Sequence, residues 1–265
     1  MASSKGAEPS AVLAIDVANT ATRLGVEREG EIVATWDSTT PASLTADEAA
    51  VVVRDFFDVR HVGFRIDEAI VSSVVPALTD AWVAAAAATS HRRPLIVGPG
   101  LKTGLRMSFD DPGEVGSDRI ADMVAAKSLF AGPIIVVDLG TTTNFEVIDD
   151  AGAFAGGIIA PGLRLSLSAL AAQAAKLTMI EVKAPRTVIG KNTRAAMQSG
   201  AVLGEIARID GLIELIEGEL GYSATVVMSG DDARALSALS RHDVRVVDDL
   251  TLRGLFALSR LNRRK

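Results

Sequence analysis

The chain has 265 residues, a length that suits two domains better than one compact core. Hydrophobic residues make up 48% and charged residues 23%, and the net charge of -6 argues against nucleic acid as the main partner. No cysteine is present, so disulfides, thiolate catalysis and cysteine-bound metals are excluded, and a reducing, cytoplasmic setting is compatible with the composition.

The first ten residues are expected to be a disordered leader. Residues 1–10, MASSKGAEPS, lack the basic start and the apolar run of a signal peptide. No later stretch reaches the roughly 18 uninterrupted apolar residues that a membrane span needs. We therefore predict a cytoplasmic protein that has neither a membrane nor a nucleic acid as its partner.

The first half of the chain alternates strand and helix patterns in an order that is typical of one fold. The predicted elements are strands at 12–17, 22–27 and 31–36, a helix at 45–59 with Thr45 as its N-cap, a strand at 68–76, a helix at 77–90 and a strand at 94–100. Three strands followed by alternating helices and strands is the order of a ribonuclease H-like domain.

The second half repeats this order. The predicted elements are strands at 134–140, 144–149 and 153–160, a helix at 164–177, a long helical stretch at 192–220, a strand at 224–230 and a terminal helix at 251–265. A helix at 116–130 joins the halves. We predict an α/β protein of actin-like architecture, in which duplicated ribonuclease H-like domains at 11–128 and 129–265 enclose a nucleotide cleft.

The first strands of the two halves end in the same short motif. In VLAIDVANTATRLGV at 12–26, Asp16 is followed by Ala18, Asn19 and Thr20; in IIVVDLGTTTNFEVID at 134–149, Asp138 is followed by Gly140, Thr141 and Thr142 at the same spacing. Gly30 and Gly152 keep the same offset in the next turn of each half. The sequence therefore indicates an internal duplication.

The duplicated motif has a chemistry that suits a nucleotide. Turns of small residues let a phosphate approach backbone N–H groups, and an aspartate at each strand end can hold a cation that neutralises the phosphates. The alternative is that Asp16 and Asp138 only cap tight turns, a common role of aspartate. Two such turns in register favour a shared ligand.

Longer motifs resemble the type III pantothenate kinases of the acetate and sugar kinase/Hsp70/actin superfamily. The first phosphate motif of that family, D-x-G-N-T-x-x-x-x-G, is matched by DVANTATRLG at 16–25, and the second, D-x-G-T-x-T-T, by DLGTTTN at 138–144. The family segment N-P-x-E-V-G-A-D-R is matched by DPGEVGSDR at 111–119. With further similar segments in the expected order, the resemblance spans about 12–258.

The resemblance implies transfer of the γ-phosphoryl group of ATP to the 4′-hydroxyl of pantothenate, the first step of coenzyme A biosynthesis, by a homodimer with composite active sites. It assigns Asp118 as the catalytic proton acceptor. The implied pantothenate contacts are Gly116, Ser117, Asp118, Arg119, Phe109 and Thr193, the last from the other subunit. The implied ATP contacts are Asp16, Val17, Ala18, Asn19, Thr20, Ala21, Thr22, Arg23, Gly140, Thr141 and Thr142. Asp138 matches a ligand of K⁺ or NH₄⁺, and Asp16 would hold Mg²⁺ directly or through water.

The type and position of Asp118 suit a general base. A carboxylate within hydrogen-bond reach can orient a primary alcohol and accept its proton, and the first turn of a helix keeps a carboxylate ionised. The following Arg119 is expected to meet the carboxylate of the substrate. The alternative is a plain preference of aspartate for a helix start capped by Ser117. Asn192 or Thr193 could likewise cap a helix, a role that does not exclude a ligand contact.

Four departures from the family pattern leave other functions open. Ala18 replaces a glycine, Phe109 a tyrosine and Asn144 a threonine, and MSGDDARAL at 228–236 puts Asp231 and Asp232 where the family has a T-G-G-x-A turn. One alternative is a non-catalytic homologue that acts as a regulatory or transcription-accessory protein, and another is a kinase for a different small hydroxyl substrate. Retention of the aspartates favours the pantothenate kinase.

Overall fold

A computed structural model describes residues 11–173 and 180–263. The predicted leader at 1–10 lies outside the described residues, as do positions 174–177 of one predicted helix and the last two residues of the terminal helix. The chain divides into two compact units. Among the described residues, the first unit comprises those up to Gly104, Asp111–Ala125 and those from Thr251 onward, and the second comprises Leu105–Asp110 and Ala126–Leu250.

The first unit is built on a five-stranded sheet. Its strands are β1 (Ala11–Val17), β2 (Ala21–Arg28), β3 (Glu31–Thr39), β4 (Glu68–Ser73) and β5 (Leu95–Ile96), and their spatial order is β3-β2-β1-β4-β5. The pairs β1–β2 and β2–β3 are antiparallel, whereas β4 and β5 run parallel to β1. Every residue of β1 is buried, as expected for a central strand that is covered on both faces.

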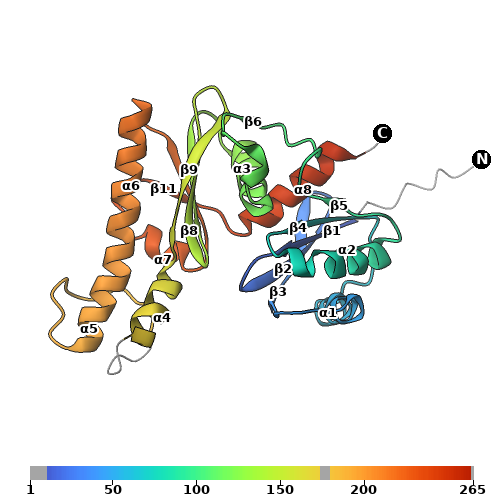
Figure 1. The fold of residues 1–265 in the computed structure, drawn as a ribbon, viewed down its shortest axis with the longest axis horizontal. Coiled ribbons are helices and arrows are strands. Elements are labelled where there is room, and N and C mark those ends of the chain that lie inside the picture. Colours follow the sequence, from blue (N-terminus) through green and yellow to red (C-terminus); the bar gives the residue numbers. More distant parts are fainter. Residues whose placement is uncertain (1–10, 174–179, 264–265) are drawn as a thin grey trace, which may run out of the picture. The chain divides into compact units, whose positions relative to one another are not determined.

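Two helices cover one face of this sheet (Figure 1). Helix α1 (Ala46–Val59) begins at the predicted N-cap Thr45, whose hydroxyl accepts from the Glu48 amide while the Glu48 carboxylate accepts from the Thr45 amide. This reciprocal pair satisfies two donors at the helix start. Helix α2 (Pro76–Ser90) begins at Pro76, where the missing N–H costs nothing. Their apolar sides bury Phe56 and Trp82 against the sheet.

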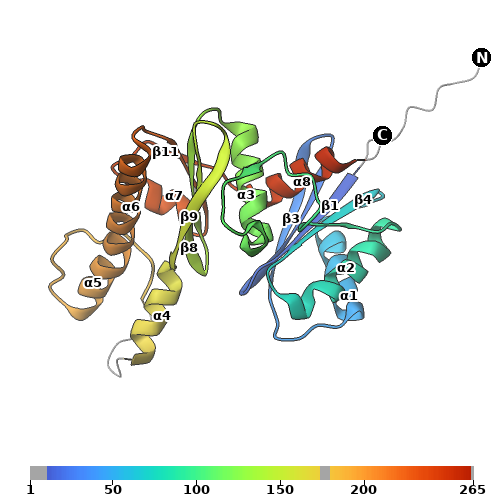
Figure 2. The ribbon, with the colours of Figure 1, turned by 45° about the horizontal axis from the view of Figure 1, so that its top comes forward.

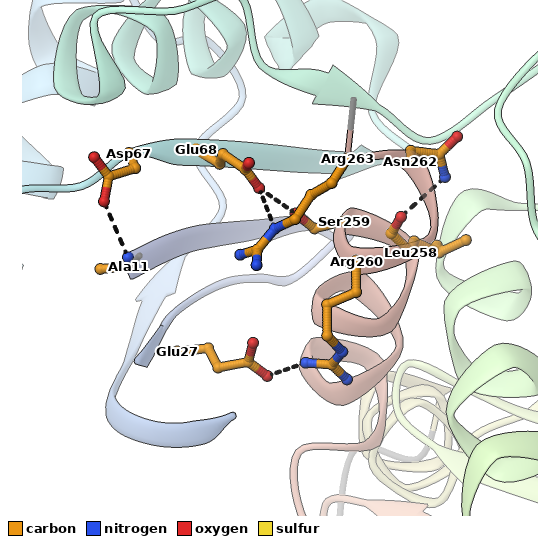
Figure 3. A network of polar contacts seen from close by, with 9 residues as sticks. All are labelled: Ala11, Glu27, Asp67, Glu68, Leu258, Ser259, Arg260, Asn262 and Arg263. Atoms are coloured by element: carbon orange, nitrogen blue, oxygen red, sulfur yellow. Dashed lines mark hydrogen bonds and ion pairs between the residues drawn. The ribbon is translucent and has the colours of Figure 1, made fainter. Parts of the chain in front are cut away.

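The C-terminal helix α8 (Leu250–Asn262) packs on the first unit, although the sequence assigned residues 129–265 to the second domain. Gly25 on β2 makes room for it, since a Cβ there would lie 2.9 Å from Leu252 Cδ1. Figure 3 shows polar contacts that fix the helix end: Arg260 pairs with Glu27, and Glu68 receives hydrogen bonds from Ser259 and, at 2.9 Å, from Arg263.

The second unit has a six-stranded sheet of the order β11-β10-β7-β8-β9-β6. Its strands are β6 (Arg106–Met107), β7 (Ile134–Leu139), β8 (Thr142–Ile148), β9 (Ala153–Pro161), β10 (Thr225–Gly230) and β11 (Val244–Val246). The core on one face combines this sheet with α4 (Leu163–Gln173), α6 (Gly204–Leu220) and α7 (Ala233–Ser237). Figure 2 shows α6 running alongside the sheet.

The predicted helical stretch at 192–220 is one continuous segment with a local change of winding. Helix α5 (Thr193–Gln198) passes through a π-helical turn at Ser199–Leu203 into α6. Ile206, Ile209 and Ile213 of α6 are buried in the core of the sheet, while Leu215 on the same helix is exposed. Most of the apolar positions in this segment therefore serve the second unit itself.

The two sheets share one topology. In each, the third, second and first strands of the half are antiparallel neighbours, and the two later strands continue parallel to the first. Gly30 and Gly152 both adopt positive φ in the turn between the second and third strands. This agreement confirms the α/β fold class and the duplication that the sequence predicted. No helix within 11–173 or 180–263 is long and apolar enough to cross a membrane.

Candidate active site in two parts

The turn after β1 is closed by its own backbone and by Thr40. The Ala18 amide donates to the Ala21 carbonyl at 3.1 Å, and the Thr40 amide donates to the Thr20 carbonyl at 3.0 Å. The Thr40 hydroxyl also donates to the Ala18 carbonyl at 2.8 Å. Ala18 does not adopt positive φ, so the alanine that replaces the motif glycine causes no backbone strain. Asn19 and Thr20 at the tip are exposed to solvent.

Asp16 lies at the end of β1 with little access to solvent. Its side chain is 6% exposed, and its Oδ1 accepts a hydrogen bond of 2.8 Å from the Ser72 hydroxyl on β4. Burial, and secondarily the charge of Asp118, raise the pKa of Asp16 to about 7, against smaller opposing effects of Ser72 and Arg23. The structure thus brings together Asp16 and Asp118, two aspartates that the sequence assigned to metal binding and to catalysis.

The surroundings of Asp16 fit a magnesium ion. A buried carboxylate that is short of positive charge gains from a divalent cation, and oxygen is the ligand that Mg²⁺ prefers. Within the described part of the chain, no group of three or more His, Cys, Asp or Glu side chains could hold a metal alone. An ion at Asp16 would therefore take its remaining ligands from phosphates and water, as Mg²⁺ does in nucleotide sites.

Asp118 stands in the first turn of α3 (Ser117–Leu129). Its Oδ1 accepts from the Arg119 amide at 2.8 Å, and a Cβ at Gly116 would overlap the same carboxylate oxygen. A glycine at 116 therefore lets the carboxylate lie against the backbone. Arg119, which the sequence is expected to bring to the carboxylate of the substrate, is only 8% exposed. Ser117 is the first residue of α3, and its hydroxyl lies 2.9 Å from that of Ser72.

The turn after β7 is one residue shorter than the turn after β1, since Leu139 pairs with Thr143 whereas Val17 pairs with Thr22, and its supports differ. The Gly140 amide donates to the Thr142 carbonyl at 2.9 Å, and the Gly162 amide donates to the Thr141 carbonyl at 3.0 Å, in the place that Thr40 takes in the first turn. A Cβ at Gly162 would lie 2.6 Å from the Thr141 oxygen, so the chain after β9 touches this turn directly. Asp138 is partly exposed, and Thr141 is exposed.

An ion pair on α6 between the buried Glu205 and the partly exposed Arg208 supports this second turn, and sequence reasoning missed it. Glu205 is 5% exposed, accepts a hydrogen bond of 2.6 Å from the Thr143 hydroxyl, and pairs with Arg208 one helical turn further on. Arg208 also donates to the Pro161 carbonyl at 2.7 Å. The pair thus contacts Thr143, which follows the turn, and Pro161, which precedes Gly162. Only the i, i+3 spacing of Glu205 and Arg208 could have signalled it.

The acidic segment after β10 lies beside the second turn. Gly230 adopts positive φ, and a Cβ there would lie 2.9 Å from Asp138 Oδ1, so glycine is required at this position. Asp232 forms an ion pair of 2.9 Å with Arg164. Asp231 and Asp232 line a small pocket together with Gly140, Thr143 and Arg164. The pairing with Arg164 offsets part of the negative charge that the sequence placed near a nucleotide.

Phe109 and Thr193, two predicted pantothenate contacts, belong to the second unit. Phe109 stacks on the buried Phe154 with ring centroids 5.2 Å apart. Thr193 is exposed at the start of α5, whose N-cap is the neighbouring Asn192. It lines a largely apolar hollow with Leu170 and Met197. The structure assigns the cap to Asn192 and leaves the Thr193 side chain on the surface.

Solved structures place the chain in a class of α/β proteins with two related sheets. A Campylobacter jejuni protein assigned to the Baf family of transcriptional activators aligns with a TM-score of 0.57 at 16% identity, covering 94% of this chain and 98% of that one. Ethanolamine utilization protein EutJ from Carboxydothermus hydrogenoformans aligns with a TM-score of 0.56 at 18% identity, covering 95% and 89%. At these identities the likeness concerns the fold.

Sequence comparisons identify the family. The model of the type III pantothenate kinases matches residues 12–215. The chain is 39% identical to the type III pantothenate kinase of Halalkalibacterium halodurans, over 95% of this chain and 99% of the relative, and 41% identical to that of Listeria innocua, over 95% and 98%. The chain therefore belongs to the type III pantothenate kinase family. The resemblance, the fold class and the enzyme class inferred from the sequence are confirmed.

Proposed function

We propose that the chain transfers the γ-phosphoryl group of ATP to the 4′-hydroxyl of pantothenate, in the cytoplasm, as the first step of coenzyme A biosynthesis. The observation that carries this proposal is the proximity of Asp118 and the buried Asp16 in the first unit. A kinase that uses ATP needs one carboxylate for the acceptor hydroxyl and another for the cation on the phosphates. Family membership supports the choice of pantothenate as the acceptor.

In this proposal the oxygen of the pantothenate 4′-hydroxyl attacks the γ-phosphorus, and Asp118 accepts the proton of that hydroxyl. The bond between the γ-phosphorus and the β,γ-bridging oxygen breaks, and ADP leaves. The hydrogen bond from the Arg119 amide orients the Asp118 carboxylate toward this task. Gly116, Ser117, Arg119 and Phe109 are the proposed neighbours of pantothenate on the same chain.

Asp16 is the proposed holder of Mg²⁺, which when bound neutralises charge on the phosphates. The exposed turns at Ala18–Thr20 and Gly140–Thr142 are the proposed phosphate contacts, with Val17, Ala21, Thr22 and Arg23 completing the ATP segment. Asp138 is proposed to hold a monovalent cation, K⁺ or NH₄⁺. Exchange of potassium for sodium or lithium should then raise the KM for ATP, and activity that is indifferent to the monovalent ion would remove this role from Asp138.

The active unit is proposed to be a homodimer in which Thr193 completes the partner's site. Large apolar side chains are exposed in both units, and those of the second unit include Ile159, Leu165, Leu170, Val188, Ile189 and Leu215. Val188 and Ile189 are 74% and 80% exposed and stand in the segment that leads to Thr193. Covering such side chains is a common reason for oligomerisation.

Mixed dimers test this arrangement. Asp118→Asn and Thr193→Arg chains should each be nearly inactive alone. Combined in one dimer they should recover activity, because one site then carries both defects and the other carries neither. If mixed dimers, confirmed by native mass measurement, gain no activity, Thr193 does not complete a site whose base belongs to its partner.

The proposed reaction is tested by ATP turnover with and without pantothenate in potassium buffer, with the product identified by mass. Pantothenate-dependent formation of ADP and of a phosphorylated pantothenate is the expected result. Turnover with another small alcohol only would indicate a different acceptor. Absence of turnover with any acceptor, in a folded protein, would favour the non-catalytic homologue.

A further inference from the structure

A chain of buried hydroxyl groups joins Asp16 to the start of α3. The Ser72 side chain on β4 is fully buried, and its Oγ donates to Asp16 Oδ1 at 2.8 Å. The same Oγ lies 2.9 Å from the Oγ of Ser117, the first residue of α3. Three elements of the first unit, β1, β4 and α3, therefore meet through two serine hydroxyls. Ser72 takes no part in the function proposed above.

The protons of these hydroxyls have one possible arrangement when Asp16 is ionised. A carboxylate only accepts hydrogen bonds, so the single proton of the Ser72 hydroxyl is committed to Asp16. The contact between the two serines must then use the proton of Ser117, with the Ser72 oxygen as acceptor. The chain runs in one direction, from Ser117 through Ser72 to Asp16.

This direction matters because Asp16 is 6% exposed and its Oδ1 accepts the hydrogen bond from the buried Ser72 hydroxyl. A hydrogen bond to a buried carboxylate is stronger than one between neutral groups, and a donor that is itself polarised by a second hydroxyl is strengthened further. Ser117 directly precedes Asp118, so the same chain also fixes the first turn of α3.

We propose that Ser72 and Ser117 are positioning residues of the active site. They orient the Asp16 carboxylate for the cation of the nucleotide complex, and Ser117 acts on Asp16 through Ser72. This inference rests on the proposed function, since it takes Asp16 as the residue that holds the cation. The competing explanation is structural only: two buried hydroxyls that satisfy each other and contribute to folding.

Single and double variants distinguish the two explanations. The set is Ser72→Ala, Ser117→Ala and the double variant, with Ser90→Ala as the matched control. Ser90 is equally buried in the same unit, and its hydroxyl donates to the Ala86 carbonyl on α2 at 2.9 Å. One measurement is the Mg²⁺ concentration that half-saturates ATP turnover. The other is independent of activity: binding of Mn²⁺ in the presence of ADP, followed by electron paramagnetic resonance.

Loss of a hydrogen bond to a charged group is expected to weaken cation binding about tenfold in Ser72→Ala. Ser117→Ala should weaken it by roughly threefold, because the bond that it removes is one step away. In the double variant the effect should equal that of Ser72→Ala alone, since Ser117 has no route to Asp16 without Ser72. Ser90→Ala should lose some thermal stability and bind Mn²⁺ as the wild type does.

Three results would overturn the inference: wild-type Mn²⁺ binding in Ser72→Ala, additive losses in the double variant, or an equal loss in Ser90→Ala. Should Ser72→Ala fail to fold, Ser72→Cys keeps the size with a weaker donor and should show a smaller loss of the same kind. Failure of the proposed function looks different. In that case the wild type would bind Mn²⁺ and ADP, with the variant pattern intact, but would not phosphorylate pantothenate.

Discussion

The turns after β1 and β7 join equivalent strands, but they differ in length by one residue and in what holds them. In the first unit, the Thr40 side chain closes the turn, and serine hydroxyls reach the strand-end aspartate. In the second, Gly162 approaches the turn without a side chain, and the support comes from the ion pair of Glu205 and Arg208 on α6. The two strand-end aspartates also differ in solvent exposure: Asp16 is buried, and Asp138 is partly exposed.

This difference shows how the two halves of a duplicated fold can take different roles in catalysis and in nucleotide binding. Sheet order and the hairpin glycines are kept, and in each unit the amide of the residue after the third strand donates to a carbonyl of the turn. The side chains around the turns have diverged, so that the first unit carries the proposed base, Asp118, and the carboxylate proposed for Mg²⁺, Asp16. In the second unit, the ion pair of Glu205 and Arg208 supports the turn that is proposed to bind the nucleotide. The following substitutions test this division.

The largest effect is expected at Asp118. Asp118→Asn keeps the size of the side chain but removes the proton acceptor, so kcat should fall by roughly 100-fold or more. Asp47→Asn is the control. Like Asp118, Asp47 lies in the first turn of a helix, where the helix dipole favours a negative charge, but it is exposed and belongs to α1. Near-normal turnover of Asp118→Asn, measured as ADP formation, would remove Asp118 from the chemistry.

Gly230→Ala should disturb the second turn strongly. Its positive φ and the close approach of Asp138 leave no place for a methyl group, so the free energy of unfolding should fall by ~2–4 kcal/mol. Gly140→Ala is the matched substitution, because a Cβ there meets its nearest neighbour at 3.8 Å. It should cost less than ~1 kcal/mol. Denaturant unfolding of both variants checks the contrast, which equal losses would contradict.

Asp16 should make the stability of the ligand-free protein depend on pH. Its pKa rises from 3.8 to about 7 on folding, so between these values the folded state holds a proton that the unfolded chain has released. The free energy of unfolding should therefore decrease as pH rises from about 4 to about 7, and this contribution should stay constant above that range. Asp16→Asn should flatten this slope and stabilise the ligand-free protein at pH 8, although it weakens Mg²⁺ binding. An unchanged slope in chemical denaturation would show that Asp16 is not the titrating group.

How far the sequence predicts this molecule depends on whether a feature is local. Thr45 predicted the start of α1 as its N-cap, and the repeated strand-end aspartates predicted the duplicated sheets. These signals lie within a few residues of each other or repeat at a fixed offset. The burial of Asp16 could not be predicted, because it depends on β4 and α3, which are distant in the chain.

The same reasoning explains the elements that were missed. Strand β6 has only two residues and exists because it pairs with β9, and β11 has three that pair with β10. Neither is long enough for an alternating pattern to show. The packing of α8 on the first unit was missed because order along the chain suggested the second half. The contacts with Gly25 and Glu27 that fix it are visible only in three dimensions.

Glu205→Gln should affect the second turn without affecting the chemistry. The substitution keeps the shape of the side chain but removes the charge that pairs with Arg208. Arg208 is partly exposed, so solvent screens part of this interaction. We expect the KM for ATP to rise about fivefold and kcat to stay within about twofold. Glu214→Gln is the control on the same helix, since Glu214 forms an exposed ion pair with Arg241. A similar change of KM in the control would remove the special role of Glu205.

The smallest effect is expected at Ala18. Ala18→Gly restores the motif glycine and should lower the KM for ATP by about twofold if the methyl group crowds the phosphates. It should also cost up to ~1 kcal/mol of stability through chain entropy. Because Ala18 has negative φ and its turn is closed by Thr40, the alanine is well accommodated in the ligand-free turn. An unchanged or higher KM would show that the turn has adapted to alanine.

The division of work between the two units is tested most directly by steady-state kinetics of Asp118→Asn and Glu205→Gln measured side by side, with ATP varied at saturating pantothenate. The account predicts opposite patterns: Asp118→Asn lowers kcat and leaves the KM for ATP near that of the wild type, whereas Glu205→Gln raises the KM for ATP and leaves kcat nearly unchanged. If both substitutions change the same parameter in the same direction, the two units do not divide the work in this way.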